Sequence, residues 1–244
     1  MIPARKRRLF RAWFGRQIEG RLRRTFGALE IHGLPRLEAA LAEGPVVVVS
    51  NHSAWWDALV ILQLVDRILH ADGHALMDAK NLRERPFFAK VGAFGVDLDD
   101  PRDGARAIRY AAGLLDGPGR LVWVFPQGRE RPESARPLGF QPGAAAIARL
   151  AKGCQVVPVG LRYVFGEAEH PEIQLAVGEP LAPEREVDAG RRRQEEEVEA
   201  LLGALERYLD GGPAPAPETR RTLERRPDRL GALAERMLAW MTPL

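Results

Sequence analysis

The sequence predicts an α/β fold in which a largely parallel central sheet is flanked by helices. Short apolar or β-branched runs alternate with segments of helical periodicity along most of the chain, which is typical of parallel strands joined by crossover helices. The run 46–49 consists of four valines, as in a strand buried on both faces. The 244 residues, of which 45% are hydrophobic and 28% charged, suffice for one domain with a sizeable core.

A basic amphipathic helix is expected first, over residues 1–27. Residues 1–24 hold nine Lys and Arg side chains and one acid, although the net charge of the whole chain is only +3. Large apolar side chains recur every three to five residues and form one stripe of a helix: Leu9, Phe10, Trp13, Phe14, Ile18, Leu22 and Phe26. Two explanations stay open, packing on the protein's own core and insertion into an anionic membrane surface. Nucleic acid is not an expected partner, because an arm that binds it seldom needs so broad an apolar face.

The main domain is expected over residues 28–210, with elements that alternate in the order the fold requires. Apolar and β-branched runs predict strands over 29–32, 45–50, 74–77, 121–125, 155–163 and 172–177. Helical periodicity predicts helices over 37–42, 55–65, 82–90, 102–115, 142–152 and 195–209. Pro142 is well placed at the start of its helix, because proline is tolerated in the first turn.

The tail has a different composition from the main domain. Residues 211–218 are rich in Pro and Ala and predict an extended, exposed linker. A C-terminal amphipathic helix is expected over 219–244, with the apolar stripe Leu230, Leu233, Met237, Leu238 and Met241. Such a stripe most often docks on the parent domain or on a sister subunit, and membrane contact is the less favoured alternative.

Composition excludes several classes of protein. The single cysteine, Cys154, cannot form an internal disulfide, which favours a reducing compartment. No apolar run approaches the roughly 20 residues that a membrane-spanning helix needs, and no signal-peptide core is visible near the N-terminus.

The strongest chemical signal directly follows the valine run, in the segment Asn51-His52-Ser53-Ala54-Trp55-Trp56-Asp57. Ligands of α/β proteins bind at the carboxyl ends of strands. A histidine there can act as a general base if a carboxylate fixes its tautomer. Five residues of a regular helix turn through about 500°, so His52 has to lie in the turn before the helix and Asp57 in its first turns. A structural histidine with satisfied hydrogen bonds is the alternative.

These residues resemble the first signature of the glycerophospholipid acyltransferase family, whose best-known members are the lysophosphatidic acid acyltransferases. Residues 125–128, Phe-Pro-Gln-Gly, are similar to that family's Phe-Pro-Glu-Gly-Thr-Arg motif. Residues 140–144 resemble its segment that opens the next helix, and 157–159 its final motif, a strand proline beside the acyl site. The resemblance covers about residues 28–180. It implies His52 and Asp57 as catalytic residues, with the following in motif or supporting roles: Asn51, Phe125, Pro126, Gln127, Gly128 and Pro158.

The sequence departs from the family pattern where the acceptor is bound. Gln127 stands where the family has Glu, and Arg129-Glu130 stands where it has Thr-Arg. Asp97 lies near the place of a second phosphate-binding arginine. Residues 129–131 and Asp97 are therefore the acceptor-binding candidates: Arg129, Glu130, Arg131 and Asp97. Acidic side chains that face the acceptor disfavour the binding of a phosphate monoester, whereas the hydroxyl groups of a sugar or polyol can donate hydrogen bonds to them.

The resemblance implies an O-acyltransferase that moves a fatty acyl group from acyl-CoA or acyl carrier protein to a lipid hydroxyl. The family default is 1-acylglycerol 3-phosphate, which gives phosphatidic acid. An unphosphorylated acceptor, such as a glycolipid, a glycosylated terpenoid or an amino-acid lipid, is the alternative. A non-catalytic, membrane-peripheral lipid-binding protein is the alternative from another class.

Further expectations concern the partners of the reaction and its place in the cell. No metal or cofactor is implied. The oxyanion is expected to bind backbone N–H groups in the turns near His52 or Gly128. The expected location is the cytoplasmic face of a membrane, bound peripherally.

Overall fold

The computed structural model describes residues 1–166 and 168–224. Its strands are β1 (Leu29–His32), β2 (Val46–Ser50), β3 (Asp72–Asp78), β4 (Ala93–Val96), β5 (Arg120–Val124), β6 (Gln155–Val164), β7 (Glu172–Val177) and β8 (Thr219–Thr222). Its α-helices are α1 (Arg8–Thr25), α2 (Leu34–Glu43), α3 (Asp57–Gln63), α4 (Ala79–Glu84), α5 (Pro101–Leu114), α6 (Gly143–Leu150) and α7 (Val187–Leu209). A π-helix, η1 (Leu64–Ile68), continues α3, and a 3₁₀-helix, η2 (Pro86–Val91), follows α4.

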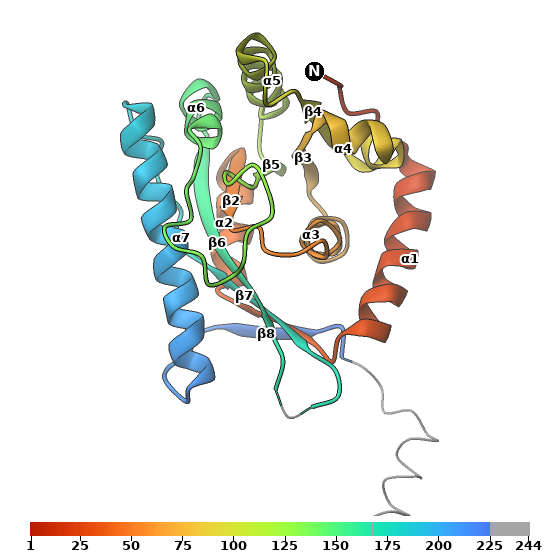
Figure 1. Ribbon diagram of the computed structural model, residues 1–244, viewed down its shortest axis with the longest axis vertical. Coiled ribbons are helices and arrows are strands. Elements are labelled where there is room, and N and C mark those ends of the chain that lie inside the picture. The colour runs from red at the N-terminus through yellow and green to blue at the C-terminus, as the bar shows by residue number, and fades with distance from the viewer. Residues whose placement is uncertain (167, 225–244) are drawn as a thin grey trace, which may run out of the picture.

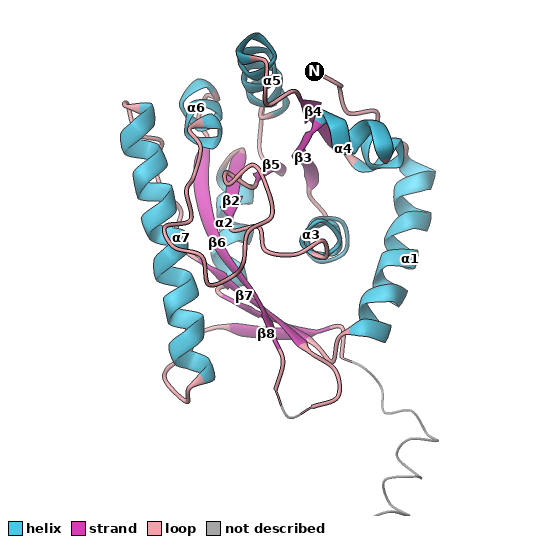
Figure 2. Ribbon diagram, viewed as in Figure 1, coloured by secondary structure: helices cyan, strands magenta, loops and turns pink. Residues whose placement is uncertain are grey.

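The strands form one eight-stranded sheet in the order β4-β3-β5-β2-β6-β7-β1-β8 (Figure 1). Five of its seven pairings are parallel, and the antiparallel ones join β6 to β7 and β1 to β8. Helices flank the sheet, as the colouring by secondary structure shows (Figure 2). The predicted fold class, a largely parallel sheet with flanking helices, is confirmed.

The valine run of β2 explains why the sheet needs helices on both faces. Val46 and Val48 belong to one apolar core, which the helices α1 to α4 cover, and Val47 and Val49 belong to a second core beneath α5, α6 and α7. Successive strand residues point to opposite faces, so a continuous apolar run is stable only where both faces are covered. This central position of β2 sets the place of the residues that follow it.

The apolar stripe of α1 divides between the core and the surface. Ile18, Leu22 and Phe26 are buried in the first core, which is the core-packing explanation of the stripe. Leu9 and Trp13, nearer the start of α1, are 86% and 55% exposed. Within the described residues, no helix combines the length and the hydropathy needed to cross a bilayer. Packing on the core therefore accounts for the second half of the stripe and leaves two large apolar side chains in solvent.

The helix predicted over residues 82–90 is wrong in its middle. α4 ends at Glu84, and the 3₁₀-helix η2 begins at Pro86. Proline lacks the N–H that would continue the helix, and it disfavours the helical conformation in the residue before it. Arg85 accordingly has φ −127° and ψ 65°.

The expected C-terminal helix does not begin at residue 219. Residues Thr219–Thr222 form β8, which pairs with β1 at the edge of the sheet. The preceding linker, 211–218, is largely exposed, but its Ala216 is buried and only 4% exposed. The stripe expected from Leu230 to Met241 lies outside the described residues.

Candidate active site

Two segments singled out in the sequence meet at one edge of the sheet. His52 lies two residues beyond the end of β2, and residues 125–128 directly follow β5. β2 and β5 are parallel neighbours with Val49 opposite Val124, so their carboxyl ends lie side by side. The order of the strands therefore brings together two segments that are about 70 residues apart in the sequence.

His52 and Asp57 form a hydrogen-bonded pair. The Nδ1 atom of His52 lies 2.7 Å from Oδ2 of Asp57, whose side chain is completely buried. The same oxygen accepts the backbone N–H groups of Ser53 (2.8 Å) and Ala54 (3.1 Å). These bonds close the turn, with His52 in it and Asp57 as the first residue of α3, which is the placement that the five-residue spacing requires. Because the carboxylate can only accept, Nδ1 carries the proton and Nε2 is left to act as a base.

A stacking contact fixes the orientation of the His52 ring, in addition to the hydrogen bond that fixes its tautomer. Phe125 stacks on it with a centroid separation of 4.2 Å and an interplanar angle of 17°. The His52 side chain remains 20% exposed, so a substrate can reach it.

Tyr163 completes the surroundings of Asp57, a role that no sequence motif indicates. Its hydroxyl donates to Oδ1 of Asp57 at 2.6 Å. Burial, together with the charge of Asp57, raises the pKa of the Tyr163 hydroxyl far above its usual value, so the group remains a donor. Tyr163 lies near the end of β6, the second neighbour of β2. Only the strand order, which no motif encodes, could have connected the two residues.

Asn51 and Gln127 support the turn that contains His52. Both polar ends of the Asn51 side chain bind the backbone of Leu161 on β6, each at 2.9 Å. Gln127 is buried, and its Oε1 accepts the backbone N–H of His52 at 2.5 Å. An amide oxygen thus makes this contact without the charge of the glutamate found in the family.

The second segment turns sharply at a glycine. Gly128 has φ +70°, in the left-handed region that favours glycine, and its N–H donates to the carbonyl of Phe125 at 3.1 Å. Pro126 accepts the N–H of Gln141 at 2.8 Å, which closes the loop between β5 and α6.

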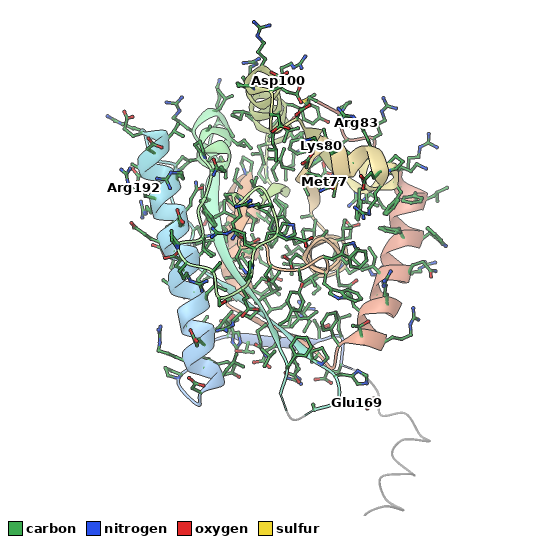
Figure 3. All side chains as sticks on the ribbon, viewed as in Figure 1. Met77, Lys80, Arg83, Asp100, Glu169 and Arg192 are labelled. Carbon is green, nitrogen blue, oxygen red and sulfur yellow. The ribbon has the colours of Figure 1, made fainter. Side chains whose placement is uncertain are left out.

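A cavity of about 430 Å³ opens beside His52 and follows the length of β3. Small residues leave this space free on the sheet side, where Ala75 of β3 is the register partner of Ala93 of β4. Most of its other lining is apolar and comes from α3, η1, β3 and η2: Ala58, Ile61, Leu62, Val65, Met77, Phe88 and Val91. Met77 is labelled in Figure 3. Such a cavity suits an extended apolar ligand whose reactive end lies at His52.

The four acceptor-binding candidates are not equivalent. Arg129 and Glu130 are exposed and line the cavity, which places them at its opening. The guanidinium of Arg131 instead donates to the carbonyls of Pro137 (2.9 Å) and Leu138 in its own loop. Asp97 does not line the cavity, and its carboxylate accepts the N–H of Asp99 at 3.2 Å. The structure brings the first two to the site and uses the other two to hold loops.

Pro158 does not line the cavity, although it was expected beside the acyl site. It pairs with Val49 in the middle of the sheet. Its ring lies against Gly178, where an added Cβ would come within 2.8 Å of the Pro158 Cγ. The residue therefore serves the packing of β6 against the segment that follows β7.

The backbone N–H groups expected to bind an oxyanion are already engaged. Those of His52, Ser53, Ala54 and Gly128 all donate within the protein, as described above. The next donors along the turn are the N–H groups of Arg129 and Glu130.

In the described part of the chain, no three His, Cys, Asp or Glu side chains gather in a way that could hold a metal ion.

An α/β fold with a His–Asp pair at the end of an apolar cavity is an arrangement that can take a proton from a hydroxyl group of a ligand. The family model described as Acyltransferase matches residues 28–162, which is more than half of the chain. The chain therefore belongs to the Acyltransferase family, the family of glycerophospholipid and lysophosphatidic acid acyltransferases, and the expected family is confirmed. This membership supports a general acyltransferase activity. In a comparison with curated proteins, no sequence matches the chain.

Proposed function

We propose that the protein transfers a fatty acyl group from an acyl thioester, either acyl-CoA or acyl carrier protein, to a hydroxyl group of a lipid. The observation that carries the proposal is the His52–Asp57 pair at the open end of the apolar cavity. The cavity would hold the acyl chain, since each buried methylene contributes about 0.8 kcal/mol.

The reaction needs one general base and no covalent enzyme intermediate. Nε2 of His52 takes the proton of the acceptor hydroxyl while the oxygen of that hydroxyl attacks the thioester carbonyl. Asp57 stabilises the imidazolium that forms. The C–S bond then breaks as the carbonyl re-forms, and His52 returns the proton to the leaving thiolate. The N–H groups of Arg129 and Glu130 are the donors that we assign to the oxyanion.

Product analysis tests this function directly. Purified protein is incubated with an acyl-CoA and with a panel of phosphorylated and unphosphorylated hydroxylated lipids, and the products are identified by mass spectrometry. An acyl ester of a panel lipid, with release of free CoA, supports the proposal. Lipid binding without any ester product, also with acyl carrier protein as donor, would instead support the non-catalytic lipid-binding alternative.

The opening of the cavity favours an acceptor without a phosphate monoester. A dianion in a partly dry site needs a well-placed arginine. Arg131 is committed to its loop, and Arg129 stands beside the acid Glu130. Arg85, the other arginine in the cavity lining, lies 3.9 Å from the carboxylate of Glu84. Leu98, which is 55% exposed, adds an apolar side chain to the same cavity. We therefore propose weaker selectivity for phosphorylated acceptors than is usual in the family, with 1-acylglycerol 3-phosphate as the competing acceptor.

Charge reversal at Glu130 is expected to change the choice of acceptor. Glu130→Arg should raise kcat/KM for 1-acylglycerol 3-phosphate, relative to a neutral monoacylglycerol, by about tenfold. The reason is that a positive side chain, which attracts the acceptor's phosphate, replaces a negative one, which repels it. Glu169→Arg makes the same charge change on the β6–β7 loop, outside the cavity lining, and should leave the ratio unchanged (Figure 3). An unmodified enzyme that already strongly favours the phosphorylated acceptor, and loses that preference in Arg129→Ala, would contradict the proposed weak selectivity.

We also propose that the first turns of α1 bind the protein peripherally to an anionic membrane, at the cytoplasmic face. Leu9 and Trp13 are exposed there and share a shallow depression with Arg7, Arg8 and Lys90. Apolar side chains surrounded by cations suit the interface of an anionic bilayer.

Loss of these apolar side chains is expected to weaken membrane binding without unfolding the protein. The double variant Leu9→Glu, Trp13→Glu should bind vesicles of phosphatidylglycerol and phosphatidylcholine at least about tenfold more weakly in a sedimentation assay. Leu150→Glu, at a site on α6 that is 52% exposed, is the matched control. Equal binding by both variants would contradict the proposal. Deletion of α1 is not a suitable test, because Ile18, Leu22 and Phe26 are part of the core.

A further inference from the structure

The carboxylate of Asp57 is fully buried and accepts four hydrogen bonds from two different sources. Three of them come from its own turn and converge on Oδ2: His52 Nδ1, Ser53 N and Ala54 N. The fourth comes from Tyr163, which lies 106 residues later and donates to Oδ1. The turn alone therefore fixes one oxygen, and only Tyr163 binds the other.

Tyr163 is held in place independently of Asp57. Its ring contacts Phe26 with a centroid separation of 5.7 Å, and its backbone N–H donates to Oε2 of Glu133 at 3.3 Å. The other oxygen of Glu133 accepts Nε of Arg162 at 2.5 Å. Glu133 belongs to the loop after β5, so this loop is fastened to β6 next to Tyr163.

We propose that Tyr163 is the positioning residue of the catalytic pair, which fixes the orientation of Asp57 and shares its negative charge. The inference rests on the proposed function. Tyr163 does not line the cavity, so it acts through Asp57 and not on the substrate. Without this donor, Asp57 would keep a buried oxygen with no partner and would attract the imidazolium more strongly.

The remaining charges around the tyrosine do not replace its hydrogen bond. The ionisable groups near it, besides Asp57, are Glu130 and Glu133 from the loop after β5 and Arg162 on β6. Burial raises the pKa of the Tyr163 hydroxyl, the negative charges of Asp57, Glu133 and Glu130 raise it further, and the hydroxyl therefore remains a donor.

The test is Tyr163→Phe, which keeps the ring and removes the hydroxyl. We expect kcat to fall about tenfold with little change in KM for the acyl donor, because Asp57 is no longer held in the orientation that aligns the ring of His52. The matched control is Tyr208→Phe on α7, which also removes a hydrogen bond from a tyrosine hydroxyl to a carboxylate, that of Glu30. Its kcat should stay unchanged.

Two further measurements separate positioning from a purely structural role. In a double-mutant cycle, Tyr163→Phe should have almost no additional effect in the Asp57→Asn background. The ¹H NMR signal of the His52 Nδ1 proton, which does not depend on turnover, should shift or broaden in Tyr163→Phe and not in Tyr208→Phe. An undiminished effect in the Asp57→Asn background or an unchanged Nδ1 signal would each overturn the inference. If no acyl ester forms with any donor, the proposed function fails, and the NMR signal still decides whether Tyr163 positions the pair.

Discussion

His52→Ala is expected to lower kcat/KM for acyl transfer by about 10²–10⁴-fold, because it removes the general base. The side chain lies at the open end of the cavity and is 20% exposed, so its loss should leave the melting temperature nearly unchanged. The measurement is the rate of CoA release with a thiol reagent, together with thermal unfolding followed by circular dichroism.

A second histidine provides the control for this variant. His70 is exposed and has φ +51°, a conformation that asparagine tolerates. His70→Asn should keep full activity. A well-folded His52→Ala protein that transfers acyl groups at close to the normal rate would rule out the mechanism.

Asp57→Asn is expected to reduce kcat by about 10²–10⁴-fold, as loss of the orienting carboxylate does in serine proteases. It should also lower the free energy of unfolding by about 1–3 kcal/mol. The four groups around Asp57 all donate hydrogen bonds, and an amide has only one accepting oxygen. The NH₂ group must therefore face a donor, either at Tyr163 or in the turn.

The two effects of Asp57→Asn are measured separately, by kinetics and by urea unfolding. Asp103→Asn removes a buried carboxylate that pairs with Arg106 on α5, outside the cavity lining, and it serves as the control for charge loss. Activity within a few-fold of the unmodified protein would show that Asp57 has no role in orienting His52.

The sequence predicts the parts of this site that are local. The valine run of β2 and the five-residue spacing place His52 in the turn and Asp57 on α3, because periodicity and turn geometry depend on neighbouring residues. The contact between Tyr163 and Asp57 is different in kind, since it depends on β6 lying beside β2. Strand order results from the packing of the whole sheet.

Other features of the chain also depend on tertiary structure that local patterns do not reveal. Arg131 matched a binding pattern by its type, but loop closure directs its guanidinium to the carbonyls of Pro137 and Leu138. The α1 stripe has a helical period in either of its two explanations, and only the tertiary structure shows that Ile18 and Leu22 are buried while Leu9 and Trp13 are not. The predicted helix over 82–90 is the exception, because Pro86 is a local signal and its effect on the helix could have been read directly.

During synthesis on the ribosome, β2 emerges long before any strand that can pair with it. Its neighbours in the finished sheet, β5 and β6, are translated only as residues 120–124 and 155–164. Until then, a nascent chain carries four consecutive valines without a partner, a segment of the kind that aggregates from partly folded states. We expect the nascent protein to need protection by a chaperone until β6 has emerged. We also expect Asp57 to have its full set of hydrogen bonds only when Tyr163 has followed it out of the ribosome.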